Sequence, residues 1–248
     1  MTTELQNETQ AASIDELPDS APLLNDPEKL RARWEADGAL YFKNIIDADA
    51  IAEVRNDYLG RLKDQGVVAS GESQPIWNGV NRLDGKLARP ISDSVWQNLV
   101  AHPSFDAAVR SFLGEAPVWV PIVVHRSAPP ADPAKINADP FFAGHQDGVS
   151  NYGIDFITCW VPLMEIDDSV GGLAVVPGSH KAVHYNKYPD ETNVVRTGVF
   201  QDSEWRRPNY KPGDLLMFHE GAGTGLAANF PPLRSWPVVS SNSVFMKR

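Results

Sequence analysis

Hydrophobic positions along the chain change their spacing near residue 117. Before that point they recur every three or four residues, which is the spacing of an amphipathic helix. This pattern predicts one helix starting at Asn25-Asp26-Pro27, a second after Asp47, and a third over residues 93–114 that ends at Gly114. Residues 39–42 interrupt the pattern and predict a short strand.

Beyond residue 117 the pattern favours short strands separated by turns. Strands are expected at residues 118–124, 152–164, 173–176, 215–218 and about 238–245. Helices followed by many short strands predict a mainly β fold with flanking α-helices, in which N-terminal helices cover a β-barrel or sandwich. Residues 1–24 are polar and are expected to form a tail, and residues 25–248 are expected to form a single domain.

Charge and cysteine content exclude several function classes. The 248 residues include 22 Lys and Arg against 32 Asp and Glu, a formal net charge of −10. Such a chain lacks the basic surface that binds a phosphate backbone, so we expect no nucleic-acid partner. No apolar run approaches the ~20 residues that cross a bilayer, so we expect no membrane partner.

The single cysteine and the N-terminus bear on the compartment. Cys159 alone forms no internal disulfide and builds no Cys-rich metal site. The polar N-terminus lacks a signal pattern, so we expect a cytoplasmic protein that acts on a small molecule. The sequence makes no prediction of oligomeric state.

The segment His145-Gln146-Asp147 gives the first indication of chemistry. Side chains two positions apart on a strand point to the same face, so His145 and Asp147 can offer a nitrogen and an oxygen to one ion. Gln146 is expected on the opposite face. Nitrogen and oxygen ligands with open coordination positions suit non-haem Fe(II). The alternative is an ordinary polar pair at a strand end.

Three further motifs follow this segment in order. They are Trp160-Val161-Pro162-Leu163, the run GGLAVVPGSHK at residues 171–181, and Gly213-Asp214 followed by Phe218. The ordered set, over about residues 35–245, resembles the phytanoyl-CoA dioxygenase family of iron- and 2-oxoglutarate-dependent oxygenases. This resemblance implies a double-stranded β-helix, a jelly-roll barrel of cupin type. It also implies Fe(II), 2-oxoglutarate as cosubstrate, and hydroxylation or another oxidation of a small organic molecule.

The resemblance also implies roles for individual residues. His145 and Asp147 match two of three iron ligands. Arg234 matches the residue that pairs with the distal carboxylate of 2-oxoglutarate, a role that suits a planar guanidinium. Trp160 matches a residue that lines the cosubstrate pocket. A core aromatic on a central strand is the alternative for Trp160.

The third ligand departs from the family pattern. The family places a histidine ten residues after the aspartate of the G-D-x-x-x-F motif, and this chain has Thr224 there. His219 is the candidate replacement: its odd offset favours the opposite face of a regular strand, but the glycines of residues 221–225 permit a bulge. Glu220 is a second candidate donor. The remaining alternatives are iron held by two protein ligands, or a catalytically silent or non-oxidative homologue.

Overall fold

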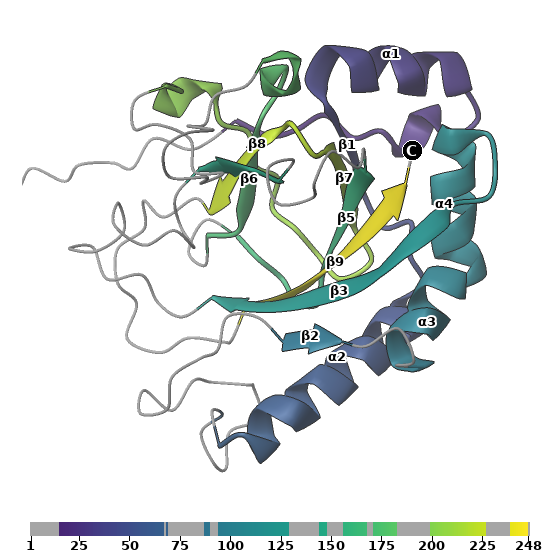
Figure 1. Cartoon of the computed structure of the whole chain (residues 1–248), viewed down its shortest axis with the longest axis vertical. Coiled ribbons are helices and arrows are strands. Elements are labelled where there is room, and N and C mark those ends of the chain that lie inside the picture. The colour runs from purple at the N-terminus through teal and green to yellow at the C-terminus, as the bar shows by residue number, and fades with distance from the viewer. Residues whose placement is uncertain are drawn as a thin grey trace, which may run out of the picture.

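Two antiparallel β-sheets form the centre of the molecule, and helices cover one side of the larger sheet (Figure 1). The computed structural model describes residues 15–66, 68, 87–89, 94–128, 144–147, 156–167, 171–182, 199–226 and 239–247. The α-helices are α1 (Pro27–Asp37), α2 (Ala48–Asp64), α3 (Ser94–Ala101) and α4 (Pro103–Leu113). Short 3-10 helices span Ala21–Leu23, Ser179–Lys181 and Asp202–Glu204.

The described strands fall into a large and a small sheet. They are β1 (Ala39–Phe42), β2 (Leu87–Arg89), β3 (Val118–Ala128), β4 (His145–Gln146), β5 (Phe156–Pro162), β6 (Leu173–Val176), β7 (Leu215–His219), β8 (Gly223–Leu226) and β9 (Val239–Lys247). The large sheet has the order β1-β7-β5-β9-β3-β2, and the small sheet has the order β4-β8-β6. Neighbouring strands come from distant parts of the sequence, so the fold depends on long-range pairing.

Local sequence signals set most helix bounds as expected. The Asp26 side chain accepts a hydrogen bond from the Lys29 amide at the start of α1, and Gly38 ends that helix with φ of 69°. The expectation of one helix over residues 93–114 is wrong, because the chain breaks at His102 between α3 and α4. Pro103 starts α4, and a proline disfavours helical geometry in the residue before it.

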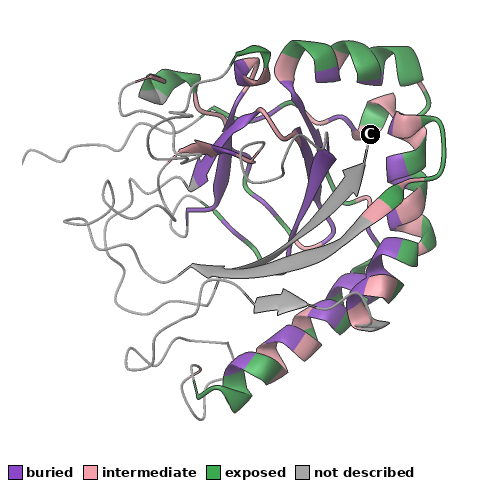
Figure 2. Cartoon of the chain, in the orientation of Figure 1, coloured by how far each residue is buried: buried purple, intermediate pink, exposed green. Residues whose placement is uncertain are grey.

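Alternate residues of the large sheet face two different cores. Figure 2 shows that β5 and most of β7 are buried. In β7, Leu215 and Met217 pack toward the helices, whereas Leu216 and Phe218 pack toward the small sheet. The first group belongs to an outer core with residues of all four α-helices. The second belongs to an inner core that also contains Val175 of β6. The inner core therefore lies between the two sheets.

Residues 15–24 of the expected tail pack onto the domain. Leu17 and Ser20 are buried, and the Asp15 carbonyl accepts a hydrogen bond from the Arg207 amide. Residues 1–14 of the expected tail lie outside the described residues. None of the helices in the part of the chain that the structure describes is long and apolar enough to cross a membrane.

The burial of Cys159 in the outer core can be tested directly. Its side chain is fully buried on β5, and burial raises the pKa of its thiol because the thiolate would lose its hydration. The native protein is therefore expected to leave Cys159 unmodified by a thiol reagent such as DTNB. One thiol per chain should react once guanidinium unfolds the protein. Rapid labelling of the folded chain would contradict this placement.

Candidate metal centre

His145 and Asp147 come together at the end of β4. The distance from His145 Nε2 to Asp147 Oδ1 is 3.5 Å, and the side chains are 18% and 20% exposed. An imidazole nitrogen and a carboxylate oxygen thus lie close together and are reached by solvent. This is the arrangement that the two-residue spacing predicts.

The pair faces the space between the sheets. The Thr158 hydroxyl donates a hydrogen bond of 3.3 Å to Asp147 Oδ2. Thr158 is buried on β5, two residues before Trp160, whose side chain belongs to the inner core. Gln146 takes the other direction, as expected, because its side-chain amide donates to the carbonyl oxygens of Ser179, Ala182 and Gly221.

Thr158 is a site residue that the motif search missed. A residue that hydrogen-bonds a carboxylate fixes its orientation, and such partners tune the affinity of a metal site. Strand alternation carries the signal that could have found it, since Thr158 and Trp160 share a face of one strand. The sequence alone did not show that Asp147 lies against this face.

Thr224 stands directly beside His145. The two residues are cross-strand partners in the β4–β8 pair, and the Thr224 hydroxyl donates to the His145 carbonyl oxygen at 3.4 Å. The side chain of Thr224 is buried. The position ten residues after Asp214 is therefore adjacent to the candidate centre, although it carries no imidazole.

His219 lies on the other side of the large sheet. It follows Leu215 and Met217 on the helix-facing side of β7, and its ring centroid is 6.0 Å from that of Trp34 in α1. The ring centroid of His180 is 5.3 Å away, and His219 Nδ1 accepts a hydrogen bond from the Gly221 amide. No bulge turns His219 inward, so the structure does not bring it to His145 and Asp147.

Glu220 does not complete the centre either. Its carboxylate accepts a hydrogen bond from the Phe156 amide at 3.1 Å and lies 3.8 Å from His219 Nδ1. Among the residues with described positions, no group of three or more His, Cys, Asp or Glu side chains is placed to hold a metal ion. The donor set that the described residues offer a ferrous ion is thus one nitrogen and one oxygen.

Of the two residues expected to bind the cosubstrate, the structure describes Trp160 and does not describe Arg234. Trp160 is 4% exposed, and its ring centroid lies 4.6 Å from that of Tyr210 in the inner core. Its placement fits a core aromatic that packs beside the space that His145 and Asp147 face. Arg234 lies outside the described residues.

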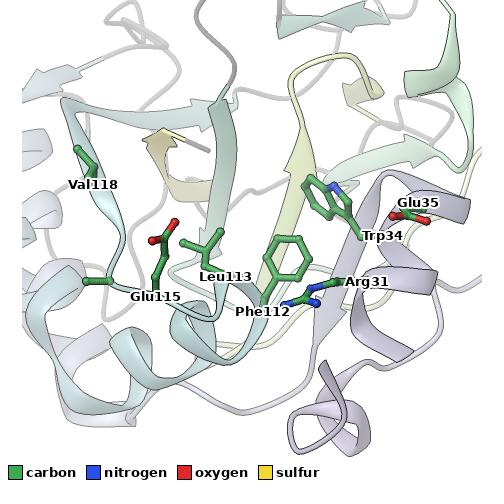
Figure 3. Close-up of a pocket in the computed structure, with 8 residues that line it drawn as sticks. Arg31, Trp34, Glu35, Phe112, Leu113, Glu115 and Val118 are labelled. Carbon is green, nitrogen blue, oxygen red and sulfur yellow. The ribbon is translucent and has the colours of Figure 1, made fainter. Parts of the chain in front are cut away.

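A separate pocket of about 390 Å³ opens on the helix side of the molecule (Figure 3). It lies between α1 and the end of α4, and Trp34 and Phe112 in its lining belong to the outer core. The lining is made by Arg31, Trp34, Glu35, Phe112, Leu113, Glu115, Ala116 and Val118. This pocket is not the candidate centre, because the latter faces the inner core.

Comparison with known families and proteins agrees with the motifs. A family model described as Phytanoyl-CoA dioxygenase (PhyH) matches residues 34–221. The matched range contains His145, Asp147 and Trp160 and ends before Thr224 and Arg234. It covers most of the described fold.

Two curated relatives are named 1-deoxypentalenic acid 11-beta-hydroxylase. The protein from Streptomyces arenae is 27% identical over an alignment of 222 residues that covers 81% of this chain and 74% of the relative. The protein from Streptomyces exfoliatus is 25% identical over an alignment of 256 positions, gaps included, that covers 95% of this chain and 83% of the relative.

Solved structures with the same fold include EctD from S. alaskensis with 2-oxoglutarate and 5-hydroxyectoine, at a TM-score of 0.62 and 19% identity. That match covers 96% of this chain and 85% of EctD. The epimerase SnoN, in complex with Fe³⁺, alpha ketoglutarate and nogalamycin RO, matches at a TM-score of 0.60 and 19% identity. It covers 90% of this chain and 84% of SnoN.

Proposed function

Because the chain belongs to the phytanoyl-CoA dioxygenase family, we propose that it is an Fe(II)- and 2-oxoglutarate-dependent oxygenase that hydroxylates a small organic molecule. The observation that carries the proposal is the approach of His145 Nε2 to the Asp147 carboxylate between the two sheets. The curated relatives named as hydroxylases support the reaction type. The alternative of a catalytically silent homologue has no support in these relatives.

The chain's own residues have distinct parts in this proposal. His145 and Asp147 hold the iron, and the Thr158 hydroxyl keeps the Asp147 carboxylate turned toward the space between the sheets. Bound iron and 2-oxoglutarate supply the oxidation of an unactivated C–H bond with dioxygen, while the protein orients the substrate. The apolar inner core beside the pair, including Trp160 and Leu216, shields the inner side of the site from water.

The proposed fold is the double-stranded β-helix of the family. Two observations support it: the facing antiparallel sheets share the inner core, and EctD and SnoN have similar folds over most of the chain. In this arrangement His145 and Asp147 lie at one mouth of the barrel. Substrate then enters between the sheets from the β4 side.

The activity is tested by adding Fe(II) and 2-oxoglutarate to the protein without oxygen and then admitting air. We expect a weak visible absorption band from the chelated cosubstrate, followed by release of succinate. His145→Ala is the matched control and should give neither signal. Neither band nor succinate from the wild-type protein would contradict the proposed function.

Arg234 is proposed to bind the distal carboxylate of 2-oxoglutarate, as the family resemblance implies. Arg234→Ala is expected to raise the KM for 2-oxoglutarate by at least about tenfold, because a carboxylate that loses its guanidinium partner loses a charge-assisted hydrogen-bonded pair. Initial rates of succinate release against cosubstrate concentration measure this effect. An unchanged KM would remove Arg234 from the site.

A further inference from the structure

The residue at the third-ligand position faces the same interior as His145. Thr224 is paired with His145 of β4 on one side and with Val175 of β6 on the other. Directly opposed residues of antiparallel strands project from the same face of a sheet. Val175 packs in the inner core, so Thr224 points between the sheets, next to His145.

The outer face of β8 is closed by two aromatic rings. A Cβ atom added at Gly223 would lie 2.9 Å from the Phe200 ring, and one added at Gly225 would lie 3.3 Å from the Trp205 ring. A register shift of one residue would turn Thr224 outward and bring its side chain against these rings. The glycines and their aromatic cover therefore fix Thr224 in the inward direction.

A threonine at this position gives the centre a weak donor in place of a strong one. Its side chain ends one bond beyond Cβ, and the hydroxyl donates to the His145 carbonyl oxygen. Among first-row metals, Fe(II) binds imidazole and carboxylate well, and a neutral alcohol is a poor substitute. No other described His, Cys, Asp or Glu side chain completes the site, so within the described residues the coordination position that Thr224 faces is open to an external ligand.

On the basis of the proposed function, we infer that iron at His145 and Asp147 binds an uncharged nitrogen donor from outside the chain in the position that Thr224 faces. The imidazole that Thr224 replaces is itself uncharged, so a neutral nitrogen leaves the charge of the centre unchanged. An anion would make the centre net negative, because the two positive charges of Fe(II) would already be balanced by Asp147 and by one carboxylate of the cosubstrate, and net charge next to the apolar inner core is costly. The substrate or effector class is a small molecule with an uncharged aromatic ring nitrogen.

The test measures Fe(II) affinity without oxygen, in the presence of saturating 2-oxoglutarate, by competition with a chromophoric chelator. Imidazole is the probe, and chloride at equal ionic strength is the anionic control. We expect imidazole to tighten Fe(II) binding by roughly tenfold or more, since even outer partners of a ligand change metal affinity by about 10–100-fold. Chloride should have less than about a twofold effect.

Two substitutions locate the effect at Thr224. Thr224→His should tighten Fe(II) binding without imidazole and should lose the imidazole response, because the chain now supplies the ring. Thr224→Val keeps the shape, removes the hydroxyl and should retain the full imidazole response. If Thr224→His does not fold, the wild-type protein still shows whether imidazole binds the iron. The measurement is spin-echo spectroscopy of the iron–nitrosyl complex with ¹⁵N-imidazole. We expect coupling of the iron signal to ¹⁵N.

Four results would overturn the inference, and one of them would also overturn the proposed function. Iron binding that depends on His145 but ignores imidazole overturns this inference and leaves the proposed function standing. An imidazole response that persists in Thr224→His overturns it as well, because the ligand then binds elsewhere. Loss of iron binding in Thr224→Val identifies the hydroxyl as the ligand and overturns it too. Absence of iron binding under all conditions overturns the proposed function together with the inference.

Discussion

His145→Ala is expected to weaken Fe(II) binding by more than about 100-fold and to abolish succinate release. His145 supplies the one nitrogen of a donor pair, and residues that merely orient ligands already change metal affinity by about 10–100-fold. With Thr224 at the third position, no second imidazole among the described residues compensates for the loss. Isothermal titration calorimetry with Fe(II) in the absence of oxygen measures the change in binding affinity.

The matched control for this prediction is His219→Asn. The His219 ring packs near Trp34 and His180 on the helix side of β7, so its removal should leave Fe(II) affinity within about twofold of the wild-type value. The fold of His145→Ala should persist, because β4 pairs with β8 through backbone groups. Iron binding that survives His145→Ala and disappears in His219→Asn would reverse the assignment.

Trp160→Ala is expected to lower the free energy of unfolding by about 3–5 kcal/mol, the usual cost of removing a buried aromatic side chain. Trp160 is 4% exposed, packs against Tyr210 and belongs to the inner core with Leu216. Truncation leaves a cavity that the two sheets cannot close without moving closer together. Guanidinium unfolding followed by circular dichroism measures the loss, and a change below about 1 kcal/mol would contradict the core role.

Trp160→Phe separates the core role from the pocket role that the family resemblance implies. The smaller ring keeps most of the apolar contact, so the stability loss should be well below that of Trp160→Ala. If Trp160 also lines the cosubstrate pocket, the KM for 2-oxoglutarate rises in the folded variant. An unchanged KM restricts Trp160 to packing.

Local signals predicted the helix starts and the face of the H-x-D motif. Asp26 and Asp47 cap α1 and α2 as expected, since N-capping depends only on the next few residues. Likewise, the two-residue spacing predicted that His145 and Asp147 come together, and they do, although Asp147 lies just beyond the end of β4. These predictions need no knowledge of the rest of the fold.

Features that depend on long-range pairing were not predictable in the same way. The glycines around residue 223 allowed a bulge that would have turned His219 inward, and only the pairing of β7 with β5 shows that His219 continues the helix-facing side. The contact between Thr158 and Asp147 joins β5 to the residue after β4, and no periodicity within one segment encodes it. The break at Pro103 was readable locally and was missed.

The most direct test of the account is a crystal structure of the protein loaded with Fe(II) and 2-oxoglutarate without oxygen, with diffraction data collected at the iron absorption edge. We expect one anomalous peak at about 2.0–2.3 Å from His145 Nε2 and from an Asp147 carboxylate oxygen, with Thr224 facing it and His219 remote from it. A peak at His219 and His180, or no peak beside His145 and Asp147 in an iron-loaded crystal, would contradict the account.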